Sequence, residues 1–219
     1  MVKPRMPPAA QKSRKREPLR RALLDLIVQG KLEGGEKLNE LQLSTRLKTS
    51  RTPLREALLH LEREGFVRSD LRRGFTVEPL SSREVRDSYP LLALLEGAAV
   101  RASAPFLPLV LPELARINAK FARARDPQTA RDLDTLFHNT LMSQSKNARL
   151  AAMVDALRLA ISRYERFYMA DPGLIAISAA QHDDIVAAFK KGDLDLGLRR
   201  LEANYTFGMQ ALLRKMGEE

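Results

Sequence analysis

Residues 38–77 read LNELQLSTRLKTSRTPLREALLHLEREGFVRSDLRRGFTV, and this stretch decides the fold of the first third of the chain. Apolar residues recur at helical spacing through most of it, which indicates two helices joined by a tight turn. Two short apolar runs around Gly74 follow and indicate a hairpin whose tip carries Arg72 and Arg73. The pattern predicts a helix-turn-helix followed by a two-stranded wing.

The second of these helices has a well-marked start. Ser50 or Thr52 can cap it through a side-chain oxygen, and Pro53 fits the first turn, where its missing N–H removes no hydrogen bond. An apolar face of Leu54, Leu58 and Leu61 is expected to pack against Leu41, Leu43 and Leu47 of the preceding helix. Arg51 and Arg55 then point outward from the helix start. Such a start suits the major groove of DNA, with the basic wing beside the backbone.

The segment from residue 18 to 79 resembles the winged helix of GntR-family bacterial transcription regulators. The resemblance rests on SRTPLREAL, LEREGFV and RRGFTV in this order and spacing. It implies that the protein binds double-stranded operator DNA through Ser50, Arg51, Thr52, Arg55, Arg73 and Gly74. Some family members have an arginine on the first helix of the motif at the position of Leu41, so their base specificity cannot be transferred to this chain.

The composition of the 219 residues agrees with DNA binding. Residues 1–80 hold 18 Lys and Arg against 10 Asp and Glu, whereas residues 81–219 hold 19 against 17. Residues 1–17 are rich in Pro and Lys and are predicted to form a basic, disordered tail. The sequence has no cysteine, which excludes disulfides, and no uninterrupted apolar run of about 18 residues. We therefore expect a cytoplasmic protein with no membrane partner.

From residue 80 to 219 the apolar residues follow helical spacing only, with turn signals between the helices. Six helices are predicted, at about 82–104, 111–124, 127–146, 148–170, 174–191 and 193–216, and Pro90 is expected to kink or split the first. Their number and order are similar to the FCD type of effector-binding domain. This resemblance implies a mainly α protein, with a winged helix-turn-helix followed by an all-α bundle that binds a small-molecule effector and forms a homodimer.

Asp134 and His138 are four residues apart, so they project from one helix face and can share a metal ion. In FCD domains with a metal centre, such a pair is followed by a histidine matching His182 and by another on the last helix. Asn204 stands at that last position, and its amide is a weaker ligand than imidazole for a zinc-like ion. Two interpretations stay open: one divalent metal held by Asp134, His138 and His182, or two histidines hydrogen-bonded inside a metal-free bundle.

The effector is expected to be an organic acid or a related metabolite. Many members that sense carboxylates carry an arginine at the position of Leu92, and a leucine cannot hold a carboxylate bidentately. The alternatives are an effector that is less acidic, one that other cations such as Arg163 bind, or no effector. Asn204 and Arg163 are the predicted effector-binding residues.

Two other functions are compatible with parts of the sequence besides a regulator that senses an effector. The helical half can be a dimerisation module without a ligand pocket. Alternatively, His138 with the adjacent pair His182 and Asp183 superficially resembles HD-type metal phosphohydrolases. That enzyme class requires at least one more histidine and leaves the winged helix unexplained, so no catalytic activity is predicted.

Overall fold

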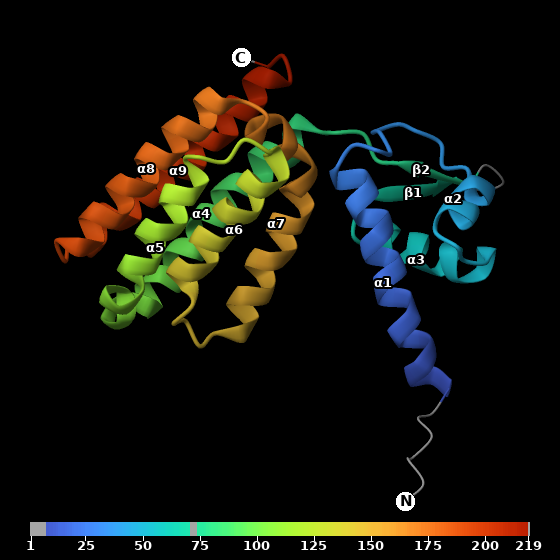
Figure 1. Cartoon of the computed structure of the whole chain (residues 1–219), viewed down its shortest axis with the longest axis horizontal. Helices are drawn as coiled ribbons and strands as arrows, with labels where there is room; N and C mark the ends of the chain where they lie inside the picture. The colour runs from blue at the N-terminus through green and yellow to red at the C-terminus, as the bar shows by residue number, and fades with distance from the viewer. Residues whose placement is uncertain (1–7, 71–73, 219) are drawn as a thin grey trace, which may run out of the picture. The chain divides into compact units, whose positions relative to one another are not determined.

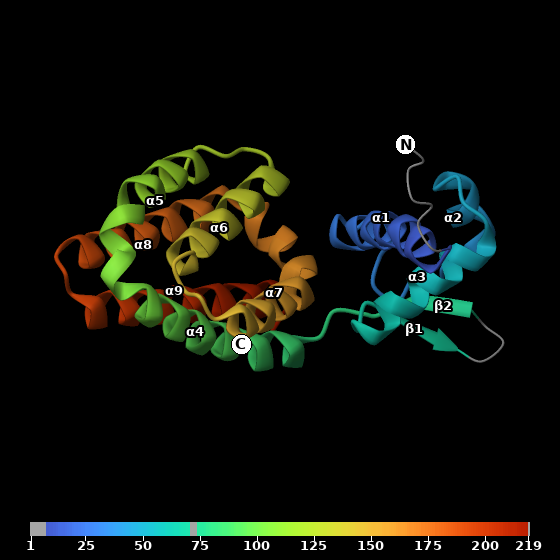
Figure 2. The ribbon, with the colours of Figure 1, turned by 90° about the horizontal axis from the view of Figure 1, so that it is seen from below.

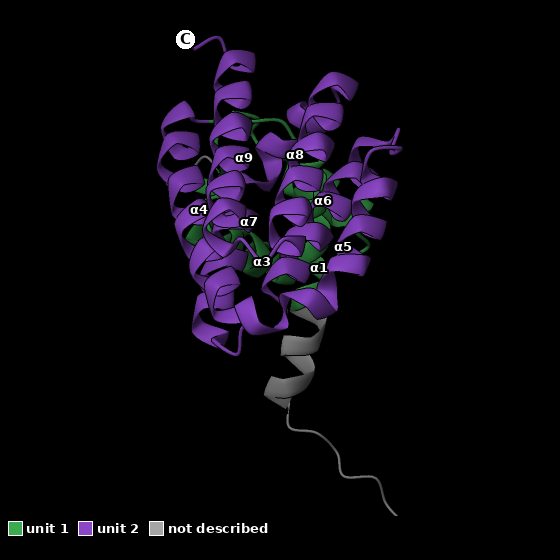
Figure 3. Cartoon of the chain, turned by 90° about the vertical axis from the view of Figure 1, so that its left-hand side faces the viewer, with its two compact units in different colours: residues 1–80 green, residues 81–219 purple. Residues whose placement is uncertain are grey.

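The computed structural model of the protein describes residues 8–70 and 74–218, with the backbone alone for residues 8–16. The chain divides into two compact units, residues 1–80 and 81–219 (Figure 3). This division lies one residue from the boundary expected between residues 79 and 80.

The first unit is a winged helix-turn-helix, as predicted. Its elements are α1 (Pro8–Val28), α2 (Glu40–Arg46), α3 (Arg51–Arg63), β1 (Val67–Asp70) and β2 (Gly74–Val77) (Figure 1). The two strands pair antiparallel, with Val67 opposite Val77 and Asp70 opposite Gly74. Gly65 ends α3 with a φ of +80°, a backbone conformation that favours glycine.

Two local predictions for this unit were wrong. Ser50 is the N-cap residue of α3, but its side chain makes no capping hydrogen bond. Leu41 does not join the core, because it lies two residues from the buried Leu43 and thus on nearly the opposite side of α2. Leu54, Leu58 and Leu61 are fully buried, as expected.

The backbone of α1 differs from the expected disordered tail. The helix begins at Pro8 and continues through Pro18 rather than starting near residue 18. Ala, Gln, Lys and Arg dominate residues 9–16, and strong helix formers extend an existing helix at little cost. The part of the tail before Pro8 lies outside the described residues.

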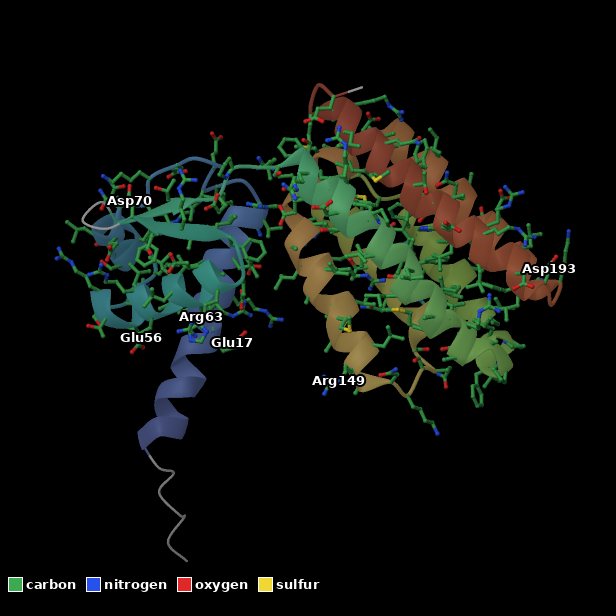
Figure 4. All side chains as sticks on the ribbon, turned by 180° about the vertical axis from the view of Figure 1, so that it is seen from behind. Glu17, Glu56, Arg63, Asp70, Arg149 and Asp193 are labelled. Carbon is green, nitrogen blue, oxygen red and sulfur yellow. The ribbon has the colours of Figure 1, made fainter. Side chains whose placement is uncertain are left out.

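The second unit is a bundle of the six predicted helices (Figures 1 and 2). They are α4 (Ser82–Ser103), α5 (Leu107–Phe121), α6 (Pro127–Met142), α7 (Ala148–Met169), α8 (Pro172–Lys190) and α9 (Leu194–Lys215), with a 3-10 turn, η1 (Ala104–Phe106), before α5. Pro90 is exposed and does not split α4. Side-chain caps start most of these helices, such as Asp193, which stands at the start of α9 and accepts from the Leu196 N–H (Figure 4).

The segment Ser82–Phe121 is long and apolar enough to cross a membrane by length and composition alone. Core helices of soluble proteins pass the same test. Here α4 packs against α9, and α5 packs against α6 and α8. A third of the most apolar window of this segment is buried in the bundle, and Leu91, Leu94, Phe106 and Leu109 of the segment are exposed.

Candidate functional site

The start of α3 borders an open hollow of about 980 Å³ on the first unit. Its lining includes Lys37, Leu41, Arg51, Thr52, Arg55 and Gly74. Arg51, Thr52 and Arg55 are exposed, and the Nε of Arg55 lies 3.4 Å from Glu40 Oε2 of α2. This ion pair links the recognition helix to the helix before it.

The wing is described only in part. Gly74 opens β2 with a φ of +84°, where a side chain would be strained. Arg72 and Arg73 lie outside the described residues, so the structure says nothing of their expected contacts. Ser50, Arg51, Thr52 and Arg55 lie at the N-terminal end of α3, and Gly74 of β2 borders the same hollow.

The second unit brings Asp134, His138 and His182 together in its interior. One ligand atom from each lies within 4.8 Å of the others. The Nε2 of His182 lies 3.6 Å from Asp134 Oδ1, and the Nε2 of His138 lies 4.0 Å from Asp134 Oδ2. The predicted spacing therefore places Asp134 and His138 on one face of α6, with Asp134 between the two imidazoles.

A hydrogen-bond chain fixes the orientation of the His182 ring. The amide nitrogen of Asn118 donates to the Ala179 carbonyl and to Asp183 Oδ1, each at 2.8 Å. The amide oxygen of Asn118 is then left to accept from His182 Nδ1 at 3.0 Å. His182 Nε2 is buried without a hydrogen-bond partner among the described residues, and it carries the lone pair. An orphaned imidazole nitrogen that faces a carboxylate fits a metal ligand.

A hydrogen bond from Nδ1 also fixes the orientation of the His138 ring. Its Nδ1 donates to Glu96 Oε2 at 2.9 Å, because a carboxylate can only accept. Glu96 is fully buried on α4 and is paired with Arg158 of α7. His138 Nε2 therefore also presents a lone pair towards Asp134.

Asn204 lies beside these residues but is held by a different neighbour. Its amide nitrogen donates to Gln181 Oε1 at 2.8 Å. The amide oxygen has no hydrogen-bond partner among the described residues, so it is the atom that Asn204 can offer to a ligand.

Asp134 and His138 border a cavity of about 50 Å³ inside the bundle, whereas His182 is not among its lining residues. Tyr89, Asp134, His138, Arg158, Glu165 and Asn204 are among its lining residues. This space is large enough for an ion with one or two waters, and a ligand of several carbon atoms requires side chains to move.

Burial sets the protonation of the cluster. It lowers the pKa of His138 and lowers the pKa of His182 far more, the latter helped by the nearby His138. It raises the pKa of the Asp134 carboxyl, against the effect of His138. The Phe137 ring stacks on His182 at 3.9 Å, which keeps one ring face dry. Both histidines are thus neutral at pH 7, the form in which imidazole binds a metal.

Sequence reasoning missed Arg158 and Glu165. Arg158 places a guanidinium at the cavity, where Leu92 offers none. This guanidinium is paired with the Glu96 carboxylate. Burial raises the pKa of Glu165 to about 7, and the neighbouring Asp134 adds to that rise. The signal for Arg158 was Glu96 itself, since a glutamate in the apolar stripe LLALLEGAAV requires a buried cation.

The structure does not bring Arg163 to the cavity. Its guanidinium pairs with Glu84 Oε2 at 2.6 Å near the start of α4. Its expected effector contact therefore has no support from its position. His60 lies on α3 in the other unit, so the helical unit lacks the additional histidine that a phosphohydrolase centre requires.

Comparison with known proteins agrees with this architecture. Residues 10–77 match the family described as bacterial regulatory proteins, gntR family, and residues 87–205 match the FCD domain. The chain belongs to the gntR family. Within it, this regulator has the FCD type of second domain, as the resemblance implied.

Relatives of this GntR regulator are transcription regulators by name. The Nta operon transcriptional regulator of Aminobacter aminovorans is 48% identical over 67 residues, 31% of this chain and 32% of that protein. The HTH-type transcriptional repressor RspR of Escherichia coli is 26% identical over 177 residues, 77% of this chain and 76% of that protein. The chain therefore spans about a third of the first relative.

Among solved structures, E. coli McbR/YncC superimposes with a TM-score of 0.77 at 22% identity. The match covers 92% of this chain and 98% of that one. At this identity it supports the fold alone, which is a winged helix followed by a helical bundle.

Proposed function

We propose that this GntR-family regulator recognises a specific operator through the start of α3 and the wing. The support is the exposed set Arg51, Thr52 and Arg55 around one hollow, with Gly74 of β2 at its edge. Glu40 holds Arg55 before DNA arrives, which reduces the ordering cost of binding. Ser50 and Arg73 complete the proposed contacts. A protein with this function binds DNA in the cytoplasm and catalyses no reaction.

Replacing Arg51 or Arg55 by Ala is expected to weaken operator binding by about 1–3 kcal/mol, because a side chain that reads a base edge is lost. The loss on random duplex should be smaller. Arg149→Ala, an exposed arginine of α7, is the matched control for lost positive charge. Fluorescence anisotropy on both duplexes measures the losses, and equal losses on both would mean phosphate contacts only.

The proposed state on DNA is a homodimer bound to a palindromic site. One winged helix offers a small contact area, and two half-sites restore affinity and specificity. The helical unit carries an apolar groove along α4 and α9 in which Leu94 is 68% exposed. Light scattering of the free protein is expected to give a dimer. A monomer both free and on DNA would contradict this.

We further propose that the Asp134, His138 and His182 cluster binds one divalent ion of the zinc type, and that an effector oxygen reaches the same ion. The single observation that carries this is the orphaned His182 Nε2, aimed at Asp134 by Asn118. A bound ion would supply positive charge for an organic acid, and the amide oxygen of Asn204 would be a weak fourth ligand. A dimerisation-only bundle has no need of an oriented, unpaired histidine.

Asn204→His is expected to complete the ligand set and raise zinc affinity at least about tenfold over wild type. Titration of the chelator-treated protein, with elemental analysis, measures this. Gln210→His, on the exposed face of the same helix and outside the groove along α4 and α9, is the matched control for an added imidazole.

If the zinc affinity of Asn204→His rises no more than that of Gln210→His, Asn204 is not a ligand position of the site. Thermal unfolding of the zinc-loaded wild type with small organic acids then tests the effector. A ligand at a hundred times its dissociation constant adds about 2.7 kcal/mol to stability. If the wild-type protein binds no zinc at all, the metal proposal is wrong. The cluster is then two histidines hydrogen-bonded inside a metal-free bundle.

A further inference from the structure

Leu41 is a large apolar side chain displayed at the DNA-facing hollow. It is 58% exposed, although it is the second residue of α2 and its backbone N–H is bound by the Asn39 cap. Leu38 and Leu43, its neighbours in sequence, are buried. The helix is therefore ordered with Leu41 held outward.

The surroundings of Leu41 are charged. The hollow that it borders is also lined by Lys37, Arg51 and Arg55, with Thr52 between the two arginines, and by the acidic Glu40 and Glu56. Single exposed leucines are common on protein surfaces and need no explanation. Here a second exposed leucine, Leu59 at 40%, lines the same hollow from α3, so the basic surface contains an apolar patch.

A leucine can neither donate nor accept a hydrogen bond, which limits what it can recognise on DNA. Every base-pair edge in the major groove offers donors and acceptors, and the one apolar group there is the thymine C5-methyl. We propose that Leu41 contacts a thymine methyl in each half-site and so selects an A·T pair at that position. This inference rests on the proposed operator recognition by α3.

The neighbouring cations make DNA the fitting partner for this patch. Lys37, Arg51 and Arg55 attract a phosphate backbone, and a protein partner that buried Leu41 would also have to desolvate them. The charges of this surface attract the phosphates of any duplex. The proposed contact of Leu41 adds a dependence on the DNA sequence.

The test starts from binding sites that the full-length protein selects from a random duplex library. Each thymine of the selected site is then replaced by deoxyuridine, which removes only the methyl group. Wild type is expected to lose about fourfold in affinity at one position per half-site, the equivalent of one buried methyl-sized group. Leu41→Ala should bind the thymine and deoxyuridine duplexes equally, and it should fold because the side chain is exposed.

Two variants serve as controls. Leu59→Ala removes the other exposed leucine of the hollow, and Leu109→Ala removes a leucine that is 73% exposed in the helical unit. Both should keep the thymine preference. A preference that survives Leu41→Ala, or is absent from wild type at every position, overturns the inference. If the library yields no common site, operator recognition itself fails, which is a separate result.

Discussion

Placing the largely buried Asp134 carboxylate, whose side chain is 19% exposed, beside two neutral histidines is the constraint on which the helical unit depends. A buried anion is costly unless positive charge or donors face it, and both nearby imidazoles turn lone pairs towards it. The unit orients those rings with hydrogen bonds from two other helices. Glu96 of α4 holds His138, and Asn118 of α5 holds His182. Four helices thus contribute residues to a geometry that the proposed cation would complete.

The position of the cavity among several helices suits the proposed effector response. Arg158 and Glu165 reach it from α7, and Asn204 and Tyr205 reach it from α9. At about 50 Å³ the cavity is smaller than a typical effector, so binding must displace side chains that belong to different helices. Movement of packed helices is a physical route from an effector to a change in operator affinity.

Sequence patterns predicted what depends on local spacing. The helix-turn-helix and wing, the six helices and the Asp134 to His138 pair all follow from periodicity and turn residues. His182 came from family resemblance. The partners that tune the site escaped prediction, because Asn118 and His182 are 64 residues apart and Arg158 and Glu96 are 62 residues apart. Leu41 and the Ser50 cap were predicted wrongly for a related reason, since apolarity or capping ability does not say which way a side chain turns.

The most direct test of the central claim is the tautomer of His138 and His182 in the metal-free protein. Long-range proton–nitrogen NMR spectra of histidine-labelled protein separate the two ring nitrogens, and a His60→Gln variant identifies the third histidine of the chain. The account predicts that both buried rings carry their proton on Nδ1 and that their Nε2 signals shift on addition of zinc. Rings protonated on Nε2, or Nε2 signals that zinc leaves unchanged, would contradict it.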